Sequence, residues 1–218
     1  MENSFWTPIG LSIEIAFVSI IWVFIFGVFF GKVMANKKFK GKVLVETIFL
    51  LPLVLPPTVV GFLLIIVFGR NSPVGYWIEW IFKQPLMFTW WAAVIASAVV
   101  AFPLMYQSAR TGFEAVDKDV ENAARVDGAN EFKVLLFIST PLAFRSIISG
   151  SILSFARALG EFGATLMFAG NIPGKTQTIP TAIYIAIDTG NMEMAWLWVT
   201  SIIAISFLML ICVQHIRS

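Results

Sequence analysis

The chain has 218 residues, of which 58% are hydrophobic and 13% are charged, and its formal net charge at pH 7 is +2. Soluble domains carry about 25% charged residues, so this composition excludes a water-soluble globular protein. A net charge this small gives no sign of a nucleic-acid partner, and we expect none. The lipid bilayer remains as the solvent, and spans of about 20 apolar residues are the unit to look for.

Five apolar stretches are long enough to cross the hydrocarbon core of a membrane as helices. They cover about residues 9–31, 43–69, 86–106, 147–169 and 195–213. A further stretch, residues 179–187, is too short to span and predicts a short helix at the outer surface. The sequence therefore predicts an all-α polytopic membrane protein, with residues 1–218 forming a single transmembrane domain.

Three prolines lie inside the second stretch, at Pro52, Pro56 and Pro57. Each lacks a backbone N–H and disturbs the helix around it. One interpretation is a kink whose free carbonyls are satisfied by helix packing, and the other is an unwound segment that lines a transport path. Pro56 and Pro57 are therefore candidates for a pathway or gate.

The distribution of lysine predicts the orientation of the spans. Residues 32–42, between the first two stretches, hold five lysines and no acidic residue. Cytoplasmic loops carry the excess of basic residues, so this loop is expected inside. The N-terminus is then outside, the loop of about residues 110–145 is inside, and the C-terminus is cytoplasmic.

The loop of about residues 110–145 is the most informative part of the chain. It is helix-prone at both ends, and the sequence DGAN predicts a break between two helices, since Gly128 can adopt the positive φ that ends a helix. The first of these helices is partly amphipathic. From the residues alone, the loop is equally a docking surface for a partner or a solvated connector.

The same loop resembles the cytoplasmic motif E-A-A-x3-G-x9-I-x-L-P of the permease subunits of ABC-type importers. The matching residues here, at unchanged spacing, are Asn122, Ala123, Ala124, Gly128, Ile138 and Pro141. Asn122 replaces the usual Glu and Thr140 replaces the usual Leu. Glu121 keeps an acid nearby, although it points about 100° away on a helix.

This resemblance implies a type I ABC importer permease fold, with about five long transmembrane helices and a short outer helix. It also implies that the loop sits in a groove of a separate ATPase and transmits its movement. The residues that would couple the two subunits are Glu121, Asn122, Ala123, Ala124, Asp127, Gly128, Ile138 and Pro141.

The fourth stretch places two ionisable residues, Arg157 and Glu161, four positions apart in an apolar helix. Ionisable groups inside a membrane usually pair or face a polar cavity. They are interpreted either as a structural ion pair or as part of a gate or pathway. Gly163 follows and allows a close helix approach or a kink.

Two segments indicate which group of ABC importer permeases the chain resembles. RALGEFGATLMFAGNIPGKTQT (157–178) and PLVLPPTVVGFLL (52–64) resemble the permeases of molybdate importers, and the likeness covers nearly the whole chain. Sulfate and thiosulfate permeases share the RALGEFG core and are the alternative, but they tend to differ after GEFG. The resemblance thus implies molybdate, and also tungstate, which has nearly the same size and charge.

The resemblance further implies the partners. They are a second copy of the chain in a homodimer, two ATPase subunits on the cytoplasmic side and an external oxyanion-binding protein, in a bacterial or archaeal cytoplasmic membrane. No cofactor or metal is expected on this chain, because ATP and Mg belong to the ATPase. A membrane enzyme is disfavoured by the lack of any catalytic motif, and an ion-coupled secondary transporter by the lack of a second related half.

Residues 169–176, AGNIPGKT, come within one residue of the phosphate-binding pattern G-x-x-x-x-G-K-T. Such a loop needs a preceding strand and free backbone N–H groups, whereas this segment follows an apolar helix and contains Pro173. It is predicted to be an outer turn, on which Lys175 either extends toward the membrane interface or helps to receive an anion or dock a binding protein at the pore mouth.

Overall fold

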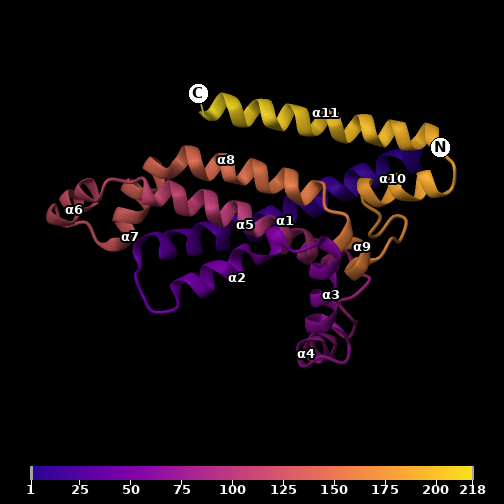
Figure 1. The fold of residues 1–218 in the computed structure, drawn as a ribbon, viewed down its shortest axis with the longest axis horizontal. Coiled ribbons are helices and arrows are strands. Elements are labelled where there is room, and N and C mark those ends of the chain that lie inside the picture. The colour runs from indigo at the N-terminus through magenta and orange to yellow at the C-terminus, as the bar shows by residue number, and fades with distance from the viewer. Residues whose placement is uncertain (1, 218) are drawn as a thin grey trace.

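The computed structural model describes residues 2–217, and every regular element within them is helical. Met1 and Ser218, the ends of the predicted single domain, lie outside the described residues. Long helices run side by side in Figure 1, and α5 packs between α1 and α8. These helices are α1 (Glu2–Asn36), α5 (Trp90–Glu114), α8 (Thr140–Leu159) and α11 (Met192–Arg217).

Small residues let the central helices approach closely. Ala101 and Ala109 of α5 are fully buried. On α1, a Cβ atom added at Gly31 would lie 2.8 Å from the Cβ of Ala109, closer than two carbon atoms can pack. This is the packing expected of membrane helices, where no hydrophobic effect drives association and van der Waals contact must do so.

Four helical segments in the described part of the chain are long and apolar enough to cross a membrane, or five if a bent pair is counted as one span. The count of about five predicted from the sequence is therefore confirmed. The first and fifth stretches fall within α1 and α11, and the third lies in α5 from Trp90 onward. The short stretch near residue 180 also forms a helix, α10 (Ile179–Asp188).

The second stretch is not one straight helix. It divides into α2 (Lys42–Val54) and α3 (Pro57–Phe68), and the chain bends by 118° between the two helices. Leu55 is extended, with φ −67° and ψ 142°, because the residue before a proline is excluded from the helical region. Pro57 then occupies the first turn of α3, where no N–H is needed. Figure 1 shows α3 projecting away from the parallel helices.

The fourth span is placed differently from the prediction. A continuous helical segment runs from Glu131 to Leu159, through α7 (Glu131–Val134), the π-helix η1 (Leu135–Ser139) and α8. The chain then breaks and restarts as α9 (Gly163–Ala169). The prediction that Arg157 and Glu161 share one helix is wrong, because Glu161 lies in the break.

The loop between the second and third stretches also contains a helix, α4 (Pro73–Phe82). Ser72 begins it, since its hydroxyl accepts a hydrogen bond from the Gly75 N–H at 2.9 Å. Figure 1 places the α1–α2 loop, α6 and the C-terminal end of α11 at one end of the bundle, and the N-terminus and α10 at the other. The two predicted cytoplasmic loops thus share an end, and the orientation in the membrane stays a prediction.

Candidate functional site

The predicted helix–turn–helix is present in the loop between α5 and α8. Its first helix is α6 (Lys118–Val126) and its second begins with α7. Gly128 has φ +89°, its N–H donates to the Arg125 carbonyl at 3.0 Å, and the Ala129 N–H donates to the Ala124 carbonyl at 3.0 Å. These two bonds form a Schellman motif, which ends a helix at a residue of positive φ.

This geometry makes Gly128 a test of the loop. Proline cannot adopt a φ of +89°, so Gly128→Pro is expected to disrupt the turn and to abolish pull-down of the ATPase partner that the resemblance implies. Gly128→Ala is the matched control. Apart from Gly128 and its two chain neighbours, no atom of residues 2–217 lies within 4 Å of the added Cβ, and the left-handed backbone costs alanine only about 1–2 kcal/mol. Normal ATPase retention by Gly128→Pro would contradict the coupling role.

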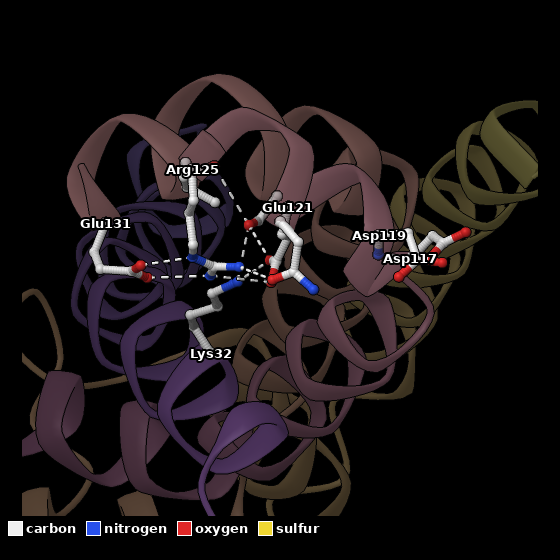
Figure 2. Close-up of polar contacts among 9 residues, drawn as sticks. Lys32, Asp117, Asp119, Glu121, Arg125 and Glu131 are labelled. Atoms are coloured by element: carbon white, nitrogen blue, oxygen red, sulfur yellow. Dashed lines mark hydrogen bonds and ion pairs between the residues drawn. The ribbon is translucent and has the colours of Figure 1, made fainter. Parts of the chain in front are cut away.

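Glu121 is the buried centre of an ionic network at the base of α6. Its Oε1 accepts hydrogen bonds from the Lys32 Nζ at 2.7 Å and from the Ser139 hydroxyl. Lys32 also donates to the Ser139 oxygen at 2.8 Å. Figure 2 shows Lys32 reaching from α1 into this cluster, while Asp117 and Asp119 point away from it. The network therefore ties α6 to α1 and to η1.

The charges around Glu121 favour its ionised form. Burial alone would raise the pKa of this carboxyl, but the hydrogen bonds from Lys32 and Ser139 and the charges of Lys32 and Arg125 outweigh that effect. The pKa of Glu121 consequently lies below the ordinary value for glutamate. The acid is thus held as a carboxylate that fixes the helix in place.

Arg125 extends the network across the turn. It binds both carboxylate oxygens of Glu131, at 2.7 and 3.2 Å, and its Nη1 donates to the Asn122 Oδ1 at 2.8 Å. A bidentate pair of this kind fixes geometry as well as charge. Asn122, at the motif position usually held by Glu, is exposed, and within residues 2–217 its side chain accepts one hydrogen bond, from Arg125. The anchoring acid of this chain is therefore Glu121, one residue earlier.

The second half of the motif lies on η1 and α8. Ile138 is half-buried and Ser139 is fully buried on the π-helix, and Pro141 follows in the first turn of α8. Proline has no N–H to bond the carbonyl four residues before it, which is a common cause of a local change in helix pitch. The altered pitch accompanies the placement of the Ser139 hydroxyl against Glu121.

The outer side of the same loop exposes apolar side chains. Val126 is 88% exposed and Phe132 is 68% exposed, on either side of the Gly128 turn. Ala123 and Asp127 are exposed and Ala124 is half-buried. Large apolar side chains that lie free on a polar loop mark a surface for a protein partner. On α6 the acid Glu121 faces the molecule, while Val120 and Val126 are exposed together with the polar residues Lys118, Asp119 and Asn122.

A second cluster of predicted residues lies where two helices are broken. The Glu161 carboxylate is 2% exposed, accepts a hydrogen bond from Arg157 Nη1 at 2.8 Å and accepts another from the Ala164 N–H at 2.8 Å. Glu161 thus ends α8 through its ion pair and begins α9 by binding a free backbone N–H. The structural interpretation of this pair is supported, and its role as a gate stays a prediction.

Gly163 lies where the break between α2 and α3 meets the break between α8 and α9. A Cβ added at Gly163 would lie 2.8 Å from the Pro57 Cβ and 3.4 Å from the Thr58 nitrogen. The first turns of α3 and α9 therefore touch through a residue with no side chain. Pro56 and Pro57 are exposed on the other side. The structure brings three predicted pathway residues, Pro57, Glu161 and Gly163, into one region.

Residues 169–176 form a closed turn. The N–H groups of Lys175, Thr176 and Gln177 all donate to the Ile172 carbonyl, at 2.9–3.1 Å, and the Ile172 N–H donates to the Thr176 hydroxyl at 2.9 Å. These donors point into the turn, so they form no phosphate cradle. Lys175 is exposed on this turn, and its role in receiving an anion stays a prediction.

Sequence reasoning missed the partners of Glu121. Lys32 was visible only as one of five lysines in a basic segment, and Ser139 was one of the unspecified positions of the motif. Their distance from Glu121 along the chain, 89 residues for Lys32 and 18 for Ser139, hides the contact. One feature of the sequence could have indicated these contacts: Glu121 is an acidic residue near the start of a partly amphipathic helix.

Comparison with known proteins agrees with this architecture. Residues 15–218 match the family model described as "Binding-protein-dependent transport system inner membrane component". A relative from Bacillus subtilis (strain 168), "Putative molybdenum transport system permease protein YvgM", is 63% identical over 213 residues, which cover 98% of this chain and 94% of the relative. The Escherichia coli (strain K12) protein "Molybdenum transport system permease protein ModB" is 43% identical over 188 residues, covering 86% and 82%.

Solved structures share the fold at low sequence identity. A chain of the MetNI methionine ABC transporter in an inward-facing conformation superposes with a TM-score of 0.74 and 14% identity, over 100% of this chain and 94% of that one. A chain of a bacterial alginate ABC transporter gives 0.72 and 16%, over 98% and 77%. The fold is that of type I ABC importer permeases, as predicted. The chain is a multi-pass membrane component of a transport system and not an enzyme, and it belongs to the family of binding-protein-dependent transport system inner membrane components.

Proposed function

We propose that this chain is the permease subunit of an ATP-driven importer of molybdate, and that it carries tungstate as well. The observation that carries the coupling role is the α6–α7 loop, anchored to α1 and η1 through Glu121, with Val126 and Phe132 exposed. The relatives named as molybdenum transport permeases carry the substrate assignment.

The partners follow from the same features. A component of a binding-protein-dependent system works with an external binding protein and, in an ABC importer, with an ATPase. We propose two ATPase subunits, each receiving one α6–α7 loop, with ATP and Mg bound only by them. We also propose a homodimer, because one chain of about five spans provides half of a pathway and one coupling loop.

In this proposal the loop transmits movement because it is rigid. The bidentate pair between Arg125 and Glu131 fixes α6 relative to α7, and the bond between Lys32 and Glu121 fixes α6 relative to α1. A displacement imposed by the closing ATPases then reaches the transmembrane helices with little loss, since packed elements switch between discrete arrangements. The pathway residues proposed at the helix breaks are Arg157, Glu161, Gly163, Pro56 and Pro57.

The test is reconstitution in liposomes of the chain with its ATPase and its binding protein. We expect uptake of molybdate that requires all three proteins and ATP, with tungstate competing and sulfate competing weakly. Uptake by this chain alone under an ion gradient would instead identify a secondary transporter. Uptake of sulfate in preference to molybdate would overturn the substrate assignment while keeping the transporter class.

A further inference from the structure

A polar cavity lies between α5 and α8, apart from both clusters described above. Its volume is about 440 Å³. Thr111, in the last turn of α5, and Arg145, in the second turn of α8, place it at the end of the bundle that carries α6 and α7. Its lining residues are Leu104, Gln107, Ser108, Thr111, Arg145, Ser146, Ser149 and Leu153.

The polar side chains of this cavity have no partners of their own. Within residues 2–217, none of its six polar lining side chains forms a side-chain hydrogen bond or an ion pair. The Ser149 hydroxyl is also buried without a partner. Polar groups on membrane helices that lack partners are stable only where they face water or a bound polar group. These side chains are therefore free to bind water or a polar guest in the cavity.

The chemistry of the lining selects an anion. Arg145 supplies a positive charge and several N–H donors, and Ser149, Thr111 and Gln107 supply further donors. No acidic residue lines the cavity, and Glu114, on the last turn of α5, is engaged by Arg110 at 2.8 Å. A single cation among neutral donors favours an anion without holding it tightly.

Close helix packing fixes the shape of the site. A Cβ added at Gly150 would lie 2.5 Å from the Ser108 Cβ, and one added at Gly112 would lie 2.7 Å from the Ser146 Cβ. These two contacts hold α5 and α8 together beside the cavity, so its donors keep their spacing. A volume of about 440 Å³ exceeds that of one small tetrahedral anion and leaves room for its water shell.

We propose that this cavity is an exit-side site for the transported oxyanion, in which Arg145 provides the charge and the hydroxyls of Thr111 and Ser149 provide donors. The inference rests on the proposed function and adds a binding site to it. Affinity there is weak, with a Kd on the order of 1 mM, because one partly hydrated cation binds the dianion. Weak binding suits release toward the cytoplasm.

The experiment measures protection of a thiol in the complete complex with its ATPase. Cys212, the lone exposed cysteine, is first replaced by serine, and Ser149→Cys is then labelled with a small methanethiosulfonate reagent. Molybdate at twice its Kd should slow labelling about threefold, and chloride at equal ionic strength should not. Thr111→Cys, at an exposed position of the same cavity, gives a second probe should the buried thiol fail to react.

Variants of Arg145 test whether its charge causes the protection by molybdate. Arg145→Gln should remove the protection and Arg145→Lys should keep most of it, while Arg70→Gln, at an exposed arginine outside the cavity, should change nothing. The inference would be overturned if molybdate did not slow labelling of either cysteine. It would also be overturned if anionic lipid blocked labelling and molybdate did not change that block. Absent protection in a complex that imports molybdate refutes only this site, whereas protection without import refutes the proposed function.

Discussion

Glu121→Ala is expected to release the ATPase from this permease and to abolish coupled uptake. The substitution leaves the Lys32 ammonium without its carboxylate at a site where the lysine side chain is only 17% exposed. Removing one partner of a buried ion pair destabilises by about 3–5 kcal/mol, and the residual exposure of Lys32 reduces this to roughly 2–4 kcal/mol. The measurements are the thermal midpoint of the purified permease and ATPase retention in pull-down.

Two controls separate the network from the surface of α6. Asn122→Ala removes one exposed hydrogen bond to Arg125 and should cost about 0.5 kcal/mol or less. In the double variant Lys32→Met/Glu121→Leu, apolar side chains replace the pair, and most of the stability should return. Wild-type ATPase retention by Glu121→Ala would contradict the anchoring role.

The stability that the Glu121 carboxylate contributes should decrease at acid pH. Because the pKa of Glu121 is lower in the folded protein than its ordinary value of 4.5, the carboxylate contributes stability above that value and loses it as the pH falls through the folded pKa. The stability difference between wild type and Glu121→Gln should therefore be constant from about pH 5.5 to 8 and shrink below about pH 4.5. A difference that already disappears near pH 6 would contradict the assignment.

Glu161→Ala is expected to have the second large effect, at the other broken region. It leaves Arg157, which is 30% exposed, without its carboxylate and frees the buried N–H of Ala164. The loss of the ion pair and the helix cap should lower the free energy of unfolding by roughly 2–4 kcal/mol and abolish uptake in the reconstituted system. Both quantities are measured on the same preparation.

A conservative variant of Glu161 and a variant of a distant acid serve as controls for Glu161→Ala. Glu161→Gln retains an oxygen for the Ala164 N–H and should recover part of the stability. Glu193→Ala removes an exposed acid near the start of α11 and should leave both stability and uptake unchanged. If Glu161→Ala is as stable as wild type yet inactive, the residue acts as a gate and its structural role is refuted.

Much of this architecture could be predicted because it depends on local composition. Apolar length determined α1, α5 and α11, and the Gly128 turn followed from the need for a positive φ between two helices. The break between α2 and α3 was suggested by Pro56 and Pro57, but its angle of 118° was not. That angle depends on the packing of α3 against α9, through Gly61 and Gly163, which are distant in sequence.

The candidate site was predicted in position and not in its contacts. The motif spacing located α6 and its turn, placed Asn122 at the position usually held by Glu and left Glu121 as an acid nearby, and the structure buries Glu121. The reason is rotational: one residue turns a helix by about 100°, and only the placement of Lys32 and Ser139 decides which side faces inward. The fourth span was misplaced because its apolar run continues through the break at Gly160–Phe162.

The unbroken helical segment from Glu131 to Leu159 has a mechanical consequence. At about 1.5 Å per residue, its 29 residues form a helical segment about 40 Å long. One end is fixed by the Arg125–Glu131 pair to the turn that we propose contacts the ATPase, and the other end lies at the ion pair between Arg157 and Glu161. Under the proposed function, movement at the turn passes along this helix to the first turns of α3 and α9, and Glu121→Ala and Glu161→Ala test its two ends.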